Sequence, residues 1–208
     1  MLRINHNFNK LSLAALALVF TGILNIPKVG GETIKNTTQL PGSGIITAVP
    51  EWKEFSSDDG KFSVLFPNEN VFEMSPPKES FVPGIQSFKI HTASNEKSAF
   101  MVGYTDFSLD ISQLPTEGLL DAFLQGLLQE KGKLLSRTNI QLGQYQGKEV
   151  KFRDEEQGMT YNTRVFLVEQ KIYFLMVVSS QTPQVSDIQK FFNSFQLVER
   201  SPNQELPK

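Results

Sequence analysis

The segment from Ile172 to Ser179 (IYFLMVVS) constrains the fold of this chain more than any other stretch. Its apolar residues occupy odd and even positions alike, so a β-strand formed here would be hydrophobic on both faces. Such a strand lies inside a sheet that is covered on both sides. We therefore expect a layered domain in which this segment is an interior strand and other elements cover the two faces of its sheet.

Alternating apolar patterns bounded by turn residues predict further strands. These cover Lys53–Ser56, Phe62–Phe66, Ile85–Thr92, Ala99–Phe107, Leu134–Leu142, Glu149–Asp154 and Met159–Val168. The short loops between most of them, including the turn Gln144 to Gly147, favour antiparallel pairing. The loop from Glu155 to Gly158 also predicts a register, with Asp154 opposite Met159, Glu149 opposite Arg164 and Phe152 opposite Tyr161.

Two segments have helical periodicity. After Pro115, leucines and Phe123 recur at the spacing of one helix face, and Gly132 is placed to end that helix. The second helix opens at Thr182-Pro183, with Thr182 as N-cap and an apolar stripe from Val185 to Phe195. The order of strands and helices predicts an α+β fold. We expect an α/β/α sandwich, with a mainly antiparallel central sheet and helices on both faces.

The apolar positions of these elements predict the residues that are buried in one core or in its two helix–sheet layers. Its expected members are Phe62, Val64, Phe66, Leu120, Phe123, Leu127, Phe174, Met176, Val178, Ile188, Phe192 and Phe195. The chain has 17 phenylalanines but only 4 tyrosines and 1 tryptophan, so most of its aromatic side chains serve packing.

The first 31 residues are typical of a secretory signal. A short basic start is followed by the uncharged apolar run from Leu11 to Leu24, and Pro27-Lys28 ends it before the length of a membrane span. An uncleaved N-terminal anchor is the alternative. We expect a signal peptide or anchor at 1–31, a flexible tether at 32–50, a folded domain at 51–199 and a polar tail at 200–208.

Composition excludes several classes of function. The chain has no cysteine, which rules out disulfides, thiolate catalysis and cysteine-ligated metal centres. Its net charge of -2 gives no reason to expect nucleic acid as a partner.

Several residues together resemble PsbP-like domains. The opening has the pattern Trp52-x-x-Phe55 followed by Asp59-Gly60 and by a strand that ends in Phe66-Pro67. The end has the strand Tyr173 to Val178, a polar gap and a helix that closes on Phe191-Phe192-x-Ser194-Phe195. The resemblance spans about 52–198, and its motifs are structural rather than catalytic.

This resemblance implies a thylakoid-lumen or periplasmic location and a photosynthetic membrane complex as partner. PsbP itself is an extrinsic lumenal subunit of photosystem II that supports calcium and chloride retention. Similar domains occur in periplasmic proteins of unknown role and in a Ran-binding nuclear-import factor, which the leader disfavours. An N-terminal extension contributes to docking in PsbP-like proteins, and the tether at 32–50 occupies the equivalent place. We carry over no binding residue of the family to a position in this chain.

The remaining candidates for chemistry are one histidine and a few carboxylates. His91 lies in a predicted strand without a nucleophile motif, so we expect a structural role. Asp58-Asp59 should shape a turn, with calcium binding as the minor alternative. Asp106 and Asp110 follow a strand end, where a paired acid/base role is a further alternative.

The run Asp154-Glu155-Glu156 is the weak candidate for a divalent cation, such as calcium, or for a partner contact. No other cofactor is expected. Two functional hypotheses follow. The first is a non-catalytic, extracytoplasmic accessory protein that docks to a membrane complex, with photosystem II as the candidate, and that associates peripherally with the membrane. The alternative is a small periplasmic hydrolase or ligand-binding protein that uses carboxylates at the sheet edge.

Overall fold

The computed structural model describes residues 51–75, 84–128, 132–180 and 184–198. The expected leader, tether and polar tail, at 1–31, 32–50 and 200–208, lie outside these residues. The elements are β1 (Lys53–Ser57), β2 (Phe62–Phe66), β3 (Phe72–Met74), β4 (Ile85–Ser94), β5 (Ser98–Phe107), α2 (Thr116–Leu128), β6 (Gly132–Leu142), β7 (Tyr145–Asp154), β8 (Met159–Val168), β9 (Lys171–Ser179), α3 (Val185–Asn193) and β10 (Gln196–Leu197).

Seven strands form the main sheet in the order β3-β4-β5-β9-β8-β7-β6, and each neighbouring pair is antiparallel. The predicted register of the β7–β8 hairpin is confirmed, because Asp154 faces Met159, Glu149 faces Arg164 and Phe152 faces Tyr161. The last pair stacks its rings with centroids 4.5 Å apart. The four-residue loop therefore sets the register, as its length predicts.

The interior position of β9 is also confirmed. It pairs with β5 on one side and with β8 on the other. Phe174, Met176 and Val178 point into one hydrophobic cluster, and Tyr173, Leu175 and Val177 point into a second cluster on the opposite face. Both faces of this strand are therefore buried, which is why neither shows polar alternation.

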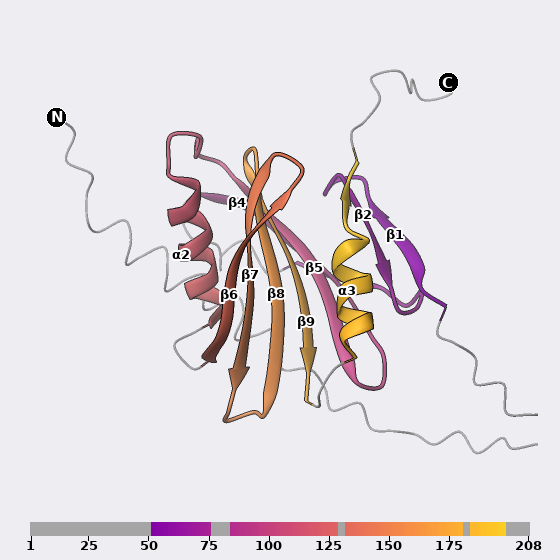
Figure 1. Cartoon of the computed structure of the whole chain (residues 1–208). Helices are drawn as coiled ribbons and strands as arrows, with labels where there is room; N and C mark the ends of the chain where they lie inside the picture. The colour runs from indigo at the N-terminus through magenta and orange to yellow at the C-terminus, as the bar shows by residue number, and fades with distance from the viewer. Residues whose placement is uncertain (1–50, 76–83, 129–131, 181–183, 199–208) are drawn as a thin grey trace, which may run out of the picture.

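The two faces of the main sheet have different covers (Figure 1). Helix α2 lies on one face and packs on β7 and β8. The other face is covered by α3 together with a three-stranded sheet in the order β1-β2-β10. The predicted α/β/α sandwich, in which helices make up the layers on both faces, is therefore wrong, because a second sheet shares the layer on one face with α3. The fold is mainly antiparallel β, with two sheets and two helices in the residues that the structure describes.

The correction has a simple physical reason. A two-faced strand requires apolar cover on each side, and a second sheet supplies such cover as well as helices do. The segments at the two ends of the described chain combine to make it. Phe62 of β2 contacts Phe195, which follows α3, at a ring distance of 5.6 Å. The Ser194 hydroxyl accepts a hydrogen bond of 2.9 Å from the Leu65 amide and thereby fixes α3 on β2.

Most of the predicted core is confirmed. Ten of its members are buried: Phe62, Val64, Phe66, Leu120, Phe123, Phe174, Met176, Val178, Phe192 and Phe195. Ile188 is only half-buried, and the Leu127 side chain lies outside the described part of the structure. Val185, the first residue of the predicted stripe on α3, is 65% exposed, because the helix begins there and turns this position toward solvent.

Several boundaries differ from the sequence-based expectations. The short strands β3 and β10 lie in segments of the expected folded domain for which we expected no strand. The β6–β7 turn consists of Gly143 and Gln144, whereas we expected a four-residue turn from Gln144 to Gly147. Gly143 adopts a left-handed φ of 58°, which allows the two-residue turn. Helix α3 has Gln184 as N-cap instead of Thr182, which lies outside the described residues, and Gly132 begins β6 instead of ending a helix.

Candidate functional site

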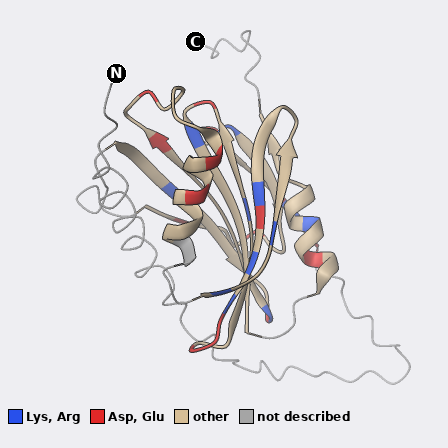
Figure 2. Ribbon diagram, turned by 60° about the vertical axis from the view of Figure 1, so that its left-hand side comes forward, with Lys and Arg blue, Asp and Glu red and all other residues tan. Residues whose placement is uncertain are grey.

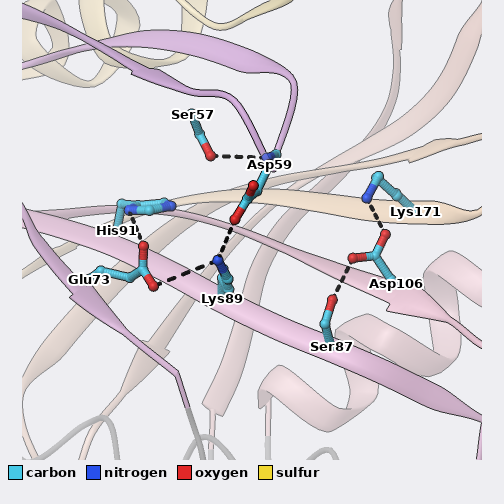
Figure 3. A network of polar contacts seen from close by, with 9 residues as sticks. Ser57, Asp59, Glu73, Ser87, Lys89, His91, Asp106 and Lys171 are labelled. Carbon is cyan, nitrogen blue, oxygen red and sulfur yellow. Dashed lines mark hydrogen bonds and ion pairs between the residues drawn. The ribbon is translucent and has the colours of Figure 1, made fainter.

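The main cluster of polar side chains lies where the β1–β2 turn meets β3, β4, β5 and β9 (Figure 3). Strand register builds it in two rows. Lys89, Tyr104 and Tyr173 are neighbours across β4, β5 and β9. Ser87, Asp106 and Lys171 form the next row in the same order of strands. Because side chains two positions apart share a face, both rows face the small sheet.

Lys89 is the centre of the first part of this cluster. Its Nζ lies 2.7 Å from Oδ2 of Asp59, on the β1–β2 turn, and 3.9 Å from Oε1 of Glu73, on β3. The hydrogen bond to Asp59 raises the pKa of Lys89 above its ordinary value. Asp59 thus joins the two sheets, a tertiary contact that its predicted role in shaping the turn did not include. These ion pairs are partly exposed, so each stabilises the fold only modestly.

His91 lies beneath the ion pairs of Lys89, with 5% of its side chain exposed. Its ring lies 4.7 Å from the ring of Phe55 and 5.9 Å from that of Phe62. Nδ1 is 3.9 Å from the Glu73 carboxylate, and Nε2 has no hydrogen-bond partner. Burial lowers the pKa of His91, with Glu73 opposing the shift. The ring therefore stays neutral at pH 7 and packs between aromatic side chains.

Asp106 and Asp110 have separate partners. Asp106 accepts hydrogen bonds from Ser87 and from the Lys171 ammonium. Asp110 accepts a hydrogen bond of 2.9 Å from the Ser112 amide and one of 3.1 Å from the Gln170 amide group. The hydrogen bonds from Ser112 lower the pKa of Asp110. Each carboxylate is thus held by hydrogen bonds to its own set of partners, and the two sets have no residue in common.

The candidate cation site is arranged as a hairpin loop. Asp154 is buried and accepts a hydrogen bond of 3.0 Å from the Gln157 amide, which closes the loop. Glu155 lies 3.9 Å from Lys133. In the part of the chain that the structure describes, no three His, Asp or Glu side chains come together as metal ligands, and this run supplies no such group.

Sequence reasoning missed a cluster of ion pairs around one buried lysine under α2. The Lys148 ammonium on β7, 4% exposed, bonds Asp121 and lies 3.4 Å from Oε1 of Glu117. Arg137 on β6 bonds the same Asp121. Figure 2 colours the acidic positions of α2 red and the basic positions of the strands blue. The spacing of Glu117 and Asp121, four residues apart on the helix, was the available signal.

Two cavities flank the end of the β6–β7 hairpin. One, of about 520 Å³, lies on the α2 side and is lined by Glu117, Leu120, Gln141 and Lys148 among others. The second, of about 460 Å³, lies on the α3 side between Ile140, Phe166 and Phe192. Arg164 at its wall bonds Glu149 at 2.5 Å and Asn193 at 3.0 Å, and its guanidinium stacks over Phe192.

The chemistry of these groups is that of structural ion pairs and buried phenols. Burial raises the pKa of Tyr104 and of Tyr161 to about 12 and that of Tyr173 still further, so all three stay protonated. The Tyr173 hydroxyl donates a buried hydrogen bond of 2.8 Å to the Gly60 carbonyl. Neither helix in the described residues has the length and apolar character needed to cross a membrane.

Comparisons with known proteins give similarities of shape only. No family model matches the chain, and no curated protein matches it. The solution structure of cyanobacterial PsbP (CyanoP) from Synechocystis sp. PCC 6803 is similar with a TM-score of 0.49 and 11% identity, over 76% of this chain and 98% of that one. PA94 from Pseudomonas aeruginosa, a protein of unknown function, has a TM-score of 0.36 and 10% identity, over 62% and 82% of the two chains.

A protein from Bacteroides thetaiotaomicron VPI-5482 has a TM-score of 0.40 and 11% identity, over 74% of this chain and 51% of that one. At these values the likenesses assign neither a family nor a function to the chain.

Proposed function

We propose that this chain is an exported, non-catalytic accessory protein that docks to a membrane protein complex, with photosystem II as the candidate partner. The leader-like segment at 1–31 supports export. The sequence resemblance to PsbP-like domains supports a docking role and a location in the periplasm or thylakoid lumen. No bound ion or other cofactor is part of the proposal.

One observation carries the proposal. The two segments that resemble PsbP-like domains, 52–67 and 173–195, meet at one interface. Strands β1 and β2 of the first segment and α3 of the second form the layer over the main sheet, and β9 of the second segment is the main-sheet strand beneath it. Phe66 contacts Phe191 at a ring distance of 5.5 Å, and Tyr173 bonds the turn at Gly60. The resembling residues are therefore those that assemble this layer, so the shared pattern concerns the scaffold and not a reaction centre.

The same layer gives the tether a defined starting point. Trp52 packs edge-on against Phe100 at 5.4 Å, and the Lys190 ammonium of α3 lies 5.2 Å from its ring centre. We expect the segment that precedes Trp52 to contact the partner together with the domain. Folding of such a segment on a partner costs a few kcal/mol of ordering, roughly, so its contribution to binding is adjustable.

The experiment is deletion of Lys35 to Ala48 with the leader kept, in the cells that encode the protein. The expected result is an unchanged melting temperature of the purified protein and weaker retention on native membranes. Two variants, His91→Ala and Asp154→Ala, serve as controls that should retain the protein on membranes. Complete recovery of wild-type protein in the cytosolic fraction would refute export. A folded His91→Ala protein without function in the cell would favour the hydrolase or ligand-binding alternative.

A further inference from the structure

The strand β6 is a long, open edge of the main sheet. Among the residues that the structure describes, its eleven residues pair with β7 alone, and the side chains at 133–139 are exposed. Helix α2 packs mainly on β7 and β8, and α3 packs mainly on β2. Figure 1 shows β6 at the margin of the sheet, beside α2. Proteins usually protect such edges with lysines, prolines or bulges.

On β6 that protection is confined to one end. Lys133 and a bulge between Leu134 and Ser136 lie at the start of the strand. From Ser136 to Leu142 the pairing is regular and the sequence, SRTNIQL, contains neither lysine nor proline. The second half of the edge is therefore open to pairing with another strand.

The geometry of the β6–β7 turn determines which backbone groups of β6 point away from β7. Gly143 and Gln144 form a two-residue loop, so the flanking pair Leu142 and Tyr145 exchanges backbone hydrogen bonds. Hydrogen-bonded and non-bonded pairs alternate along an antiparallel ladder. The amide and carbonyl groups of Arg137, Asn139 and Gln141 therefore point away from β7, toward the free edge.

The side chains of this half-strand divide by face. Arg137 bonds Asp121 of α2, which places Arg137, Asn139 and Gln141 on the α2 side. Ile140 and Leu142 pack with the cluster on the α3 side, and both line the cavity beside Phe192. One face of the edge is thus polar, with the charge of Arg137 paired to Asp121, and the other is apolar at Ile140 and Leu142.

Charge indicates the chemistry of a partner. The hairpin from Gly132 to Asp154 holds five basic residues and two acidic ones, a net charge of +3, whereas the whole chain has a net charge of -2. Asp121 and Glu117 of α2 pair with Arg137 and Lys148 and reduce the local excess to +1. A second copy of this chain would bring two such basic hairpins together. An extended segment with acidic side chains has the complementary charge.

We propose that β6 is a strand-addition site for an extended segment of a partner protein in which apolar and acidic residues alternate. The added strand bonds the outward groups of Arg137, Asn139 and Gln141. Its apolar residues cover Ile140 and Leu142, and an acidic residue lies opposite Arg137. This inference rests on the proposed docking function and names the feature of the partner that is recognised.

The test uses a defined probe, the fluorescein-labelled peptide SVTFEVES, and fluorescence anisotropy with the full chain without its leader. In antiparallel pairing the peptide's phenylalanine faces Ile140 and its second glutamate faces Arg137. The isomer SVFVTEES has the same composition without the alternation. We expect the alternating peptide to bind at least about tenfold more tightly, because only its pattern fits both faces of the edge.

Two substitutions at one position isolate the backbone. Asn139→Pro removes an outward N–H without breaking the ladder to β7, so it should weaken peptide binding about tenfold, whereas Asn139→Ala keeps that N–H and should bind normally. If the proline variant does not fold, amide hydrogen exchange of the wild-type protein tests whether the peptide binds at this edge. Residues 137, 139 and 141 should gain protection when the peptide binds.

Equal binding of both peptides, or no added protection at these three amides, would overturn the proposal. A wild-type dimer in sedimentation that Asn139→Pro abolishes would also overturn it, because the occupant would then be a second copy. These measurements are independent of membrane retention, so the strand-addition site and the proposed function can fail separately.

Discussion

Removal of the Asp121 carboxylate should destabilise the fold through Lys148. The Lys148 ammonium is 4% exposed and is bonded by Asp121, while Glu117 lies 3.4 Å away. In an Asp121→Ala variant the buried ammonium keeps only the Glu117 carboxylate, which is 73% exposed. A buried charge without its partner is costly, because the protein interior does not replace the solvation that water supplied.

The magnitude follows from the geometry. Breaking a fully buried ion pair costs about 3–5 kcal/mol. Asp121 is itself 36% exposed, so water can enter the vacated site, and Glu117 can move closer. We therefore expect the free energy of unfolding to fall by about 2–3 kcal/mol in Asp121→Ala. Glu117→Ala, which removes an exposed partner, should cost less than about 1 kcal/mol.

Urea unfolding followed by the fluorescence of Trp52 measures both changes. With a slope of about 2 kcal/mol per molar urea, the midpoint should fall by about 1–1.5 M for Asp121→Ala. The double variant Asp121→Leu with Lys148→Met removes both charges and should recover most of the loss. The argument from burial is wrong if the urea midpoint of Asp121→Ala lies within about 0.3 M of the wild type, which is roughly the precision of such measurements. It is also wrong if Glu117→Ala lowers the free energy of unfolding as much as Asp121→Ala does.

Three further predictions concern the layer around the small sheet. Because burial lowers the pKa of His91, the unfolded state binds more protons below about pH 6.5, so stability should fall as the pH drops below that value. Urea midpoints at several pH values should show this loss, and His91→Phe should remove it. Tyr173→Phe leaves the buried Gly60 carbonyl without its donor and should cost about 1–2 kcal/mol in thermal unfolding. Phe192→Ala should cost about 3–5 kcal/mol, and a melting temperature within a degree or two of the wild type would mean that α3 is not docked as described.

Local sequence patterns predicted the parts of this protein that depend on neighbours in the chain. The length of the Glu155 to Gly158 loop set the β7–β8 register, and with it the contact between Glu149 and Arg164. The apolar run of β9 predicted its interior position. Both depend on strand geometry over a few residues, where a one-residue shift would move side chains to the opposite face.

The candidate site was less predictable, because its contacts join distant segments. Three of its contacts each require a particular docking of elements. They are the ion pair of Lys148 with Asp121, the ion pair of Lys89 with Asp59 and the packing of aromatic rings around His91. Periodicity identifies the face that an element buries, but it does not identify the side chain that it meets.

The sequence by itself determined that β9 has two buried faces, which residues supply most of the core and how the β7–β8 hairpin pairs. Only the tertiary structure decided that a second sheet shares the cover with α3, because β2 and α3 are far apart in the chain. The bond between Leu65 and Ser194 spans 129 positions, and the one between Tyr173 and Gly60 spans 113. Such contacts form only when both segments reach the same face of the sheet, so hydrophobic burial over the whole domain selects them and no local pattern encodes them.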